Sequence, residues 1–193
     1  KRRLEEISGE LCLVIHMSQM EPDVLRSLNP QAMLLSGCGT FFQFFKPEDF
    51  YRFEDTLNAM EDVPTLGICG SHQIMGFMFN DGFRNLTELD DELMRPLEPG
   101  EPDPQSDPNP VAAGYFSEEG FYPINVCKSD PLFEGLPDPF TVKQSHYAEI
   151  KTLPPDFELI GTNDNCRIQA MKHASRPLYG TQFHPEACAD VYP

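Results

Sequence analysis

Residues 65–73 read Thr-Leu-Gly-Ile-Cys-Gly-Ser-His-Gln, an apolar segment joined to an apolar helix through a turn of small residues. This pattern predicts a buried strand that turns sharply into a helix, because only small side chains let other backbone approach the turn closely. Cys69 stands at the tip of the turn, where the N-terminus of the helix favours a thiolate over a thiol. We therefore predict that Cys69 is a nucleophile; the alternative is a buried structural cysteine at a strand end.

A second segment, residues 180–186, reads Gly-Thr-Gln-Phe-His-Pro-Glu. His184 and Glu186 are two positions apart, so in extended chain their side chains point the same way and the carboxylate can orient the imidazole. Pro185 helps to keep this segment extended. A His-Pro-Glu sequence alone is weak support, since most histidines have no catalytic role. Together with Cys69 it supplies the parts of a Cys–His–acid triad.

The segments around these two motifs predict an α/β fold. Apolar runs at 11–15, 32–35 and 63–68 have the composition of strands buried on both faces, and helices are predicted at 47–60 and 73–79. This alternation is typical of a three-layer fold with a mostly parallel central sheet between helices. Later strand candidates lie too close together for intervening helices, so we predict a mixed or antiparallel second half. They are residues 122–126, 141–142, 148–151, 159–162, 168–172 and 178–183.

Residues 98–110 read EPGEPDPQSDPNP and interrupt this pattern with five prolines and four acidic residues. No strand or helix can run through such a segment. We expect an exposed loop inserted into one domain that spans residues 1–193. A domain boundary here is the less favoured alternative, since the later strands are needed to complete the sheet begun by the first half.

Composition limits the possible functions. The 193 residues carry a formal net charge of −17, which disfavours binding to a phosphate backbone and argues against nucleic acid as a partner. No apolar run approaches the ~18 residues of a membrane helix, and the start of the chain does not resemble a signal peptide, so we expect no membrane association. The six cysteines form no C-x-x-C pair and have no zinc-ligand spacing. We expect reduced thiols, no bound metal and a cytoplasmic location.

The motifs resemble those of class I glutamine amidotransferases. The elbow at residues 65–73 is similar to the family's G-[IV]-C-x-G-x-Q motif, and residues 180–186 are similar to its second motif. Residues 36–39, Ser-Gly-Cys-Gly, stand where the family has its glycine-rich oxyanion loop. Residues 144–147, Gln-Ser-His-Tyr, resemble the segment whose backbone helps to hold glutamine. All four motifs occur in the family's order.

The resemblance implies a flavodoxin-like fold and a role for each matched residue. It implies a chain from which the family's first strand and C-terminal helix are missing. Catalysis would use Cys69 as nucleophile, His184 as base and Glu186 as orienting carboxylate. The oxyanion would be held by backbone N–H groups, and glutamine by three further residues. The oxyanion donors are Gly70 and the Gly37–Cys38 loop, and the substrate contacts are Gln73, Ser145 and His146.

The resemblance also implies a reaction. The side-chain amide of glutamine would be hydrolysed through a cysteinyl thioester without a cofactor, and the ammonia would pass to a synthase domain or subunit. One alternative is a stand-alone hydrolase of γ-glutamyl compounds, which can use the same triad. Another is a catalytically silent relative that binds or regulates.

The sequence departs from the family pattern at three places beside the nucleophile. Ser71 replaces a usual glycine, Gly70 replaces a usual bulky apolar residue, and Cys38-Gly39 replaces the end of the usual S-G-G-P loop. Oxyanion donors are backbone groups, so none of these changes removes a catalytic group.

Residues 41–45, Phe-Phe-Gln-Phe-Phe, follow the oxyanion loop. We favour the interpretation that most of these rings pack under the next helix. The alternative is that two or more are exposed near the site and contact a synthase domain.

Overall fold

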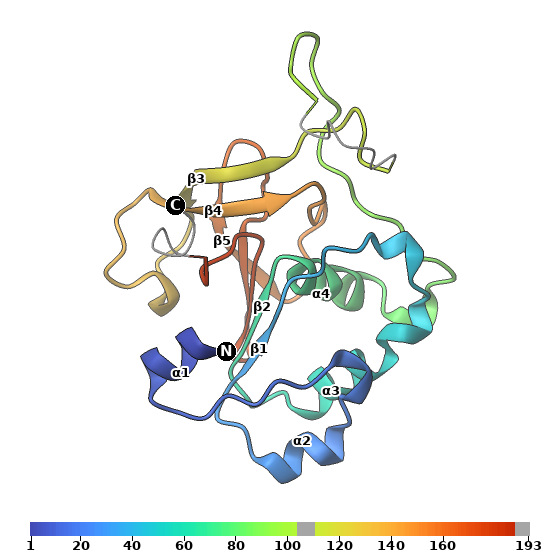
Figure 1. Ribbon diagram of the computed structural model, residues 1–193, viewed down its shortest axis with the longest axis vertical. Coiled ribbons are helices and arrows are strands. Elements are labelled where there is room, and N and C mark those ends of the chain that lie inside the picture. The colour runs from blue at the N-terminus through green and yellow to red at the C-terminus, as the bar shows by residue number, and fades with distance from the viewer. Residues whose placement is uncertain (104–110, 188–193) are drawn as a thin grey trace.

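The computed structural model describes residues 1–103 and 111–187, which form a seven-stranded sheet with helices packed against it (Figure 1). The strand order is β1-β2-β7-β6-β5-β3-β4. The strands are β1 Met33–Leu35, β2 Thr65–Ile68, β3 Glu118–Val126, β4 Phe140–His146, β5 Phe157–Thr162, β6 Ala170–His173 and β7 Leu178–Thr181.

The sheet has a parallel part and an antiparallel part. Strands β1, β2 and β7 run parallel, with Met33 opposite Thr65 and Thr65 opposite Leu178. From β7 onward the neighbouring strands β6, β5, β3 and β4 pair antiparallel, and this part is the larger of the two. The predicted α/β fold with a mixed second half is therefore confirmed. The expectation of a mostly parallel sheet is wrong, because the closely spaced later strands pair antiparallel and make up the larger part of the sheet.

Four α-helices and five short 3-10 turns are the helical elements of the described chain. The helices are α1 Arg2–Ser8, α2 Pro22–Leu28, α3 Tyr51–Ala59 and α4 Gly70–Asn80, and the 3-10 turns are η1 Met17–Gln19, η2 Phe42–Phe44, η3 Pro47–Phe50, η4 Phe83–Asn85 and η5 Pro131–Phe133. Helix α4 is apolar nearly all round and buries most of its residues, as expected of a helix enclosed by the core. Met75 of α4 packs with Phe53 of α3 and Met171 of β6 in the main apolar cluster. The first turn of α4, which begins at the elbow, is therefore held by the core.

The strand predicted at residues 11–15 is wrong. These residues belong to no described strand, and Leu11 and Val14 are 78% and 79% exposed. Only the end of the run, at Ile15, packs against the core. An apolar run indicates a tendency to be buried, but a strand also needs a hydrogen-bonded neighbour, and none of the described strands pairs with this run.

The strand predicted at residues 148–151 is also wrong. Ala148 and Ile150 are buried, but pairing is limited to a single bridge between Ala148 and Leu93. The carbonyl oxygen of Ala148 instead accepts hydrogen bonds from the side chains of Gln73 and His146, at 2.7 and 2.9 Å. The apolar pattern of these residues therefore reflects their burial beside the site and does not indicate a hydrogen-bonded strand.

The loop predicted at residues 98–110 is described only as far as residue 103, and its residues 104–110 lie outside the described residues. The segment that leads into it projects from the body of the molecule at the top of Figure 1. Glu101 lies there against Arg95, with guanidinium-to-carboxylate distances of 2.7 Å.

The phenylalanine-rich segment is mostly packed inward. Phe41 and Phe42 are 4% and 3% exposed, Phe45 is half-buried, and Phe44 is 68% exposed. The alternative, in which these rings contact a synthase domain, requires at least two exposed rings, and only one is exposed. The interpretation that most of them pack inward is therefore confirmed. Within the described part of the chain, no helix combines the length and apolar character needed to cross a membrane.

Candidate active site

Cys69 lies at the elbow between β2 and α4, in a backbone conformation that residues other than glycine rarely adopt. Its φ is 51° and its ψ is −111°, and it is the N-cap residue of α4. A non-glycine residue with positive φ costs about 1–3 kcal/mol and persists only where its surroundings enforce it. Here the N–H of Cys69 donates to the carbonyl oxygen of Thr181 at 2.7 Å, which ties the elbow to the end of β7.

Gly70 is required by close contact with the predicted oxyanion loop at residues 36–39. A Cβ atom at Gly70 would lie 2.5 Å from the backbone nitrogen of Cys38 and 2.7 Å from its Cβ. A bulky residue directly after the nucleophile would therefore displace the loop. This departure from the family pattern matches the tight approach of Cys38.

Replacing Gly70 with alanine is expected to lower kcat on the order of 10²-fold, the cost of losing one oxyanion donor, because the added methyl group pushes the Cys38 backbone away. Gly39→Ala in the same loop is the matched control, since a Cβ there meets no atom within 4 Å. Steady-state assays of glutamine hydrolysis, the activity that the resemblance implies, measure the effect in both variants. Equal activities of the two variants would contradict the proposed role of the contact.

Gly37 and Ser71 place the rest of the oxyanion loop. A Cβ at Gly37 would lie 3.4 Å from both the Cβ of Cys69 and Cε1 of His184, so this glycine lies against both residues. Ser71 donates its hydroxyl hydrogen to the carbonyl oxygen of Ser36 at 2.5 Å. The serine that replaces the family's usual glycine therefore fastens the loop to the first turn of α4.

His184 and Glu186, the predicted base and orienting carboxylate, follow β7 and contact each other. Nδ1 of His184 lies 2.7 Å from a carboxylate oxygen of Glu186, and the N–H of His184 donates to the carbonyl oxygen of Lys143 at 2.9 Å. Hydrogen bonds to Cys69 and Glu186 raise the pKa of His184 to about 10, so the ring carries its second proton at neutral pH. Burial alone would raise the pKa of Glu186, but the hydrogen bond and charge of His184 hold it below its usual value.

Ser145 faces the sulfur of Cys69, whereas the ring of His146 is directed into the protein. The carbonyl oxygen of Ser145 lies 3.8 Å from Sγ of Cys69. His146 is 5% exposed and directs Nδ1 to the carbonyl oxygen of Ala148 and Nε2 to the carboxylate of Glu118, each at 2.9 Å. With both ring nitrogens engaged, a substrate contact from His146 would come from its backbone.

Glu118 is a buried carboxylate surrounded by donors. It is 0% exposed and receives hydrogen bonds from His146, Gln169, Asn163 and Asn165. Burial alone would raise its pKa, but these bonds, that of His146 first, hold the pKa below its usual value. The carboxylate is therefore ionised and fastens the end of β4, where Ser145 lies.

Gln73 and Gln182 form a buried amide pair next to the nucleophile. Nε2 of Gln73 donates to the carbonyl oxygen of Ala148 at 2.7 Å and to Oε1 of Gln182 at 3.1 Å. Nε2 of Gln182 in turn lies 3.8 Å from Sγ of Cys69. The sequence motifs alone do not single out Gln182, although it is two residues before His184 and so shares its face in extended chain.

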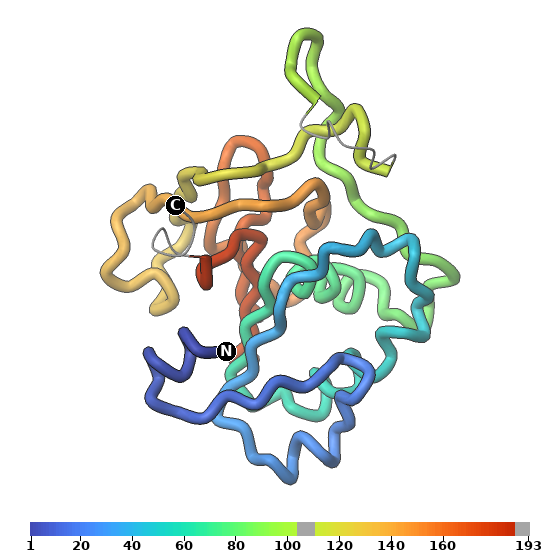
Figure 2. The backbone as a smooth tube through the Cα atoms, viewed as in Figure 1, coloured from blue at the N-terminus to red at the C-terminus, as the bar shows by residue number. Residues whose placement is uncertain are grey.

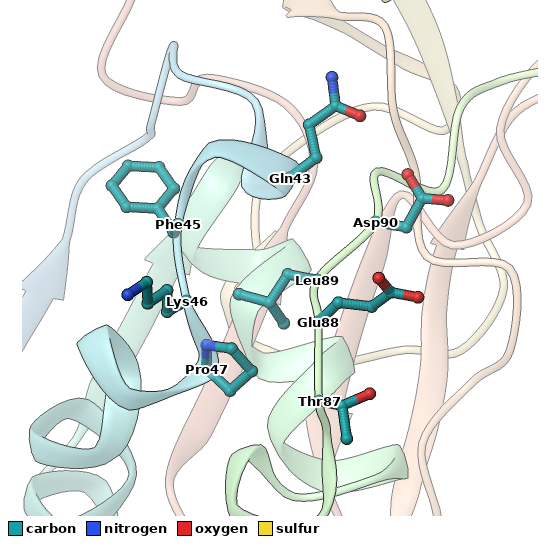
Figure 3. A pocket seen from close by; sticks show the side chains of 8 residues that line it. All are labelled: Gln43, Phe45, Lys46, Pro47, Thr87, Glu88, Leu89 and Asp90. Atoms are coloured by element: carbon teal, nitrogen blue, oxygen red, sulfur yellow. The ribbon is translucent and has the colours of Figure 1, made fainter.

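A cavity lined by Gln43, Phe45 and six further residues lies apart from these residues. Figure 3 shows it between the segment of Phe45 and Lys46 and the segment of Glu88 and Asp90, and its volume is about 390 Å³. Among the described residues, its lining includes none of the predicted site residues, and no cluster of three or more His, Cys, Asp or Glu side chains is arranged to hold a metal.

Comparison with known proteins gives a family and several relatives. The family model described as glutamine amidotransferase class-I matches residues 14–191. The glutamine-hydrolysing GMP synthase subunit of Pyrococcus abyssi is 29% identical over 185 residues, covering 96% of this chain and 80% of the relative. The corresponding protein of Pyrococcus furiosus is 30% identical, covering 85% of this chain and 70% of the relative.

Solved structures share the fold. A Thermoplasma acidophilum protein described as a GMP synthase subunit superposes with a TM-score of 0.69 at 24% identity, covering 96% of this chain and 76% of the other. A glutamine amidotransferase of Thermotoga maritima superposes with a TM-score of 0.56 at 16% identity, covering 93% of this chain and 76% of the other.

Proposed function

The chain belongs to the class-I glutamine amidotransferase family, and on that premise we propose that it hydrolyses the side-chain amide of glutamine at Cys69 and supplies the ammonia to a synthase subunit. The observation that carries the proposal is the position of Cys69. It is held at φ 51° on the elbow, and Gly37 lies against both Cys69 and His184, since a Cβ there would be 3.4 Å from the Cβ of Cys69 and from Cε1 of His184. Glu186 orients that histidine. A structural cysteine has no need of such a strained turn or of such a neighbour.

In the first half of the reaction, the thiolate of Cys69 attacks the amide carbon of glutamine. The negative charge that develops on the amide oxygen is held by the N–H of Gly70 and by an N–H of the Gly37–Cys38 loop. The imidazolium of His184 gives its proton to the amide nitrogen, the carbon–nitrogen bond breaks, and ammonia leaves. A glutamyl thioester on Cys69 remains.

In the second half, water hydrolyses the thioester. The imidazole of His184, now neutral, removes a proton from the attacking water, and the oxyanion forms again in the same position. The carbon–sulfur bond then breaks, glutamate leaves and Cys69 returns as a thiolate beside an imidazolium. Glu186 stabilises the imidazolium at each stage through its hydrogen bond to Nδ1.

The names of the relatives suggest which partner receives the ammonia. Because they are glutamine-hydrolysing subunits of GMP synthase, we propose that a synthase subunit is the partner and that residues 1–193 act as one glutaminase domain. The carbonyl oxygen of Ser145 lies 3.8 Å from the sulfur, which supports contacts of Ser145 and of the backbone of the next residue, His146, with bound glutamine.

Parallel assays of glutamine and of a γ-glutamyl peptide test this function. We expect release of glutamate and ammonia from glutamine, with a higher kcat/KM than for the peptide and a further rise when a GMP synthase subunit is added. Cys69→Ala serves as the background control. Cleavage of the peptide without hydrolysis of glutamine would overturn the proposal in favour of a γ-glutamyl hydrolase, and absence of both activities with the partner present would indicate a silent relative.

A further inference from the structure

Gln182 places a neutral hydrogen-bond donor against the sulfur of Cys69. Its side chain is 0% exposed, and its Nε2 lies 3.8 Å from Sγ, within hydrogen-bonding range for sulfur. On the other side, Sγ lies 3.8 Å from the carbonyl oxygen of Ser145, which can only accept a hydrogen bond. A thiol can donate to that carbonyl, whereas a thiolate meets an oxygen dipole that repels it.

The hydrogen-bond network fixes which end of the Gln182 amide faces the sulfur. Oε1 of Gln182 accepts from Nε2 of Gln73, and the second proton of Gln73 goes to the carbonyl oxygen of Ala148. If the Gln182 amide were reversed, its NH₂ group would face the NH₂ group of Gln73, and two donors would meet without an acceptor. Gln73 therefore holds the N–H of Gln182 toward Cys69.

Main-chain hydrogen bonds hold Gln182 and Cys69 close to each other. The N–H of Gln182 donates to the carbonyl oxygen of Gln169 at 2.8 Å, and the preceding residue, Thr181, accepts from the N–H of Cys69 at 2.7 Å. The donor and the sulfur are thus attached to neighbouring, hydrogen-bonded strand ends. Their separation is set by the sheet and does not depend on a flexible loop.

We propose that Gln182 is a thiolate-stabilising residue of the glutaminase reaction, oriented by Gln73 and acting through its side-chain N–H on Sγ of Cys69. A hydrogen bond to the charged form of a group favours that form. Unlike His184, the amide neither gains nor loses a proton, so its hydrogen bond is available at every stage. It acts before the attack on glutamine and again when the thioester carbon–sulfur bond breaks and sulfur regains its charge.

The inference rests on the proposed function for its catalytic meaning, but alkylation tests it without any turnover of glutamine. The rate at which iodoacetamide modifies Cys69 is measured against pH by mass spectrometry of the peptide that contains it, because the thiolate is the reacting form. Gln182→Met keeps the length and volume of the side chain and removes the donor. We expect the midpoint pH of alkylation to rise by about one unit, so that labelling below the midpoint is about tenfold slower.

Two further variants make the test specific. Gln169→Met is the matched control: Gln169 is another fully buried glutamine, but its amide donates to Glu118 and not to sulfur. We expect its midpoint to stay at the wild-type value even if its stability falls. Gln73→Met leaves Gln182 without its orienting donor and should shift the midpoint in the same direction by a smaller amount. If Gln182→Met does not fold, this variant and Gln182→Asn, whose shorter amide withdraws from the sulfur, give the result.

The outcomes separate the two proposals. A wild-type midpoint in Gln182→Met, or an equal shift in Gln169→Met, overturns the role of Gln182 even when glutamine is hydrolysed normally. If Gln182→Met does not fold, wild-type midpoints in Gln73→Met and Gln182→Asn overturn it equally. A shift confined to the Gln182 and Gln73 variants supports it, including in a protein that proves to hydrolyse no glutamine, where only the proposed function fails.

Discussion

Cys69→Ala is expected to lose glutaminase activity on the order of 10⁴-fold or more while keeping its fold, because the change removes the nucleophile and leaves the elbow in place. Alanine carries a Cβ as cysteine does, so the cost of φ at 51° is the same in both proteins. The thermal midpoint should therefore change little. Assays of glutamate release together with thermal unfolding measure both parts of the result.

Cys69→Gly is the informative companion variant. This protein also lacks the thiol, so it should be as inactive as Cys69→Ala. Glycine adopts positive φ without strain, so relief of the backbone should add up to about 1 kcal/mol of stability, which the greater entropy of glycine in the unfolded chain opposes. A marked loss of stability in both variants would instead identify Cys69 as a structural cysteine.

Labelling gives an independent check on the nucleophile. A glutamine-analogue electrophile should modify Cys69 and leave the other cysteines unmodified. Burial raises the pKa of Cys166 well above its usual value, and burial together with the charge of Asp138 raises the pKa of Cys127. Neither thiol offers a thiolate at neutral pH, so modification of either one in place of Cys69 would rule out the proposed mechanism.

His184→Ala is expected to be the next most damaging change, with kcat/KM falling on the order of 10³- to 10⁴-fold. The substitution removes both the proton donor to the amide nitrogen, which leaves as ammonia, and the positive charge near the sulfur. Glu186→Gln should cost less, about 10- to 10²-fold, because the carboxylate acts only through the ring of His184. Steady-state kinetics of the two variants measure the order, and a larger loss in Glu186→Gln would contradict these roles.

The same pair predicts a change in the pH profile. Hydrogen bonds to Cys69 and Glu186 raise the pKa of His184 to about 10, so the imidazolium is present below that pH and is lost as pH rises through it. Activity that depends on the imidazolium should therefore fall on the alkaline side near pH 10. Since Glu186 contributes to raising the pKa, Glu186→Gln should move this alkaline limb to lower pH, whereas a purely structural role would leave it unchanged.

Local features of this fold could be predicted from the sequence, and non-local ones could not. The strand, turn and helix around Cys69 are specified within nine residues, by small side chains at the turn and apolar ones on both sides. The run at 11–15 has the same apolar composition as a buried strand, but whether a strand lies beside it is decided elsewhere in the chain. Residues 148–151 show the converse, because they are buried without joining a ladder.

The candidate site divides in the same way. The elbow at Cys69 and the contact between His184 and Glu186 could be predicted from the two motifs, since each motif carries its own backbone geometry. Gln182 is inside the second motif, yet its contact with sulfur depends on the pairing of β2 with β7 and on the amide of Gln73. Likewise, no local signal showed that the ring of His146 is turned toward Glu118, a residue of another strand.

The order of the strands constrains how the chain can acquire its fold during synthesis. Among the described strands, β7 is the last to emerge from the ribosome, yet it lies between β2 and β6. Figure 2 shows the red end of the trace beside the green segment of β2. Until β7 is made, β2 and β6 each present an unpaired edge to other chains. The nascent polypeptide therefore depends on late closure of its sheet, a non-local step that is slow and exposed to aggregation. A ribosome that stalls before residue 178 produces a chain that lacks both His184 and a complete sheet.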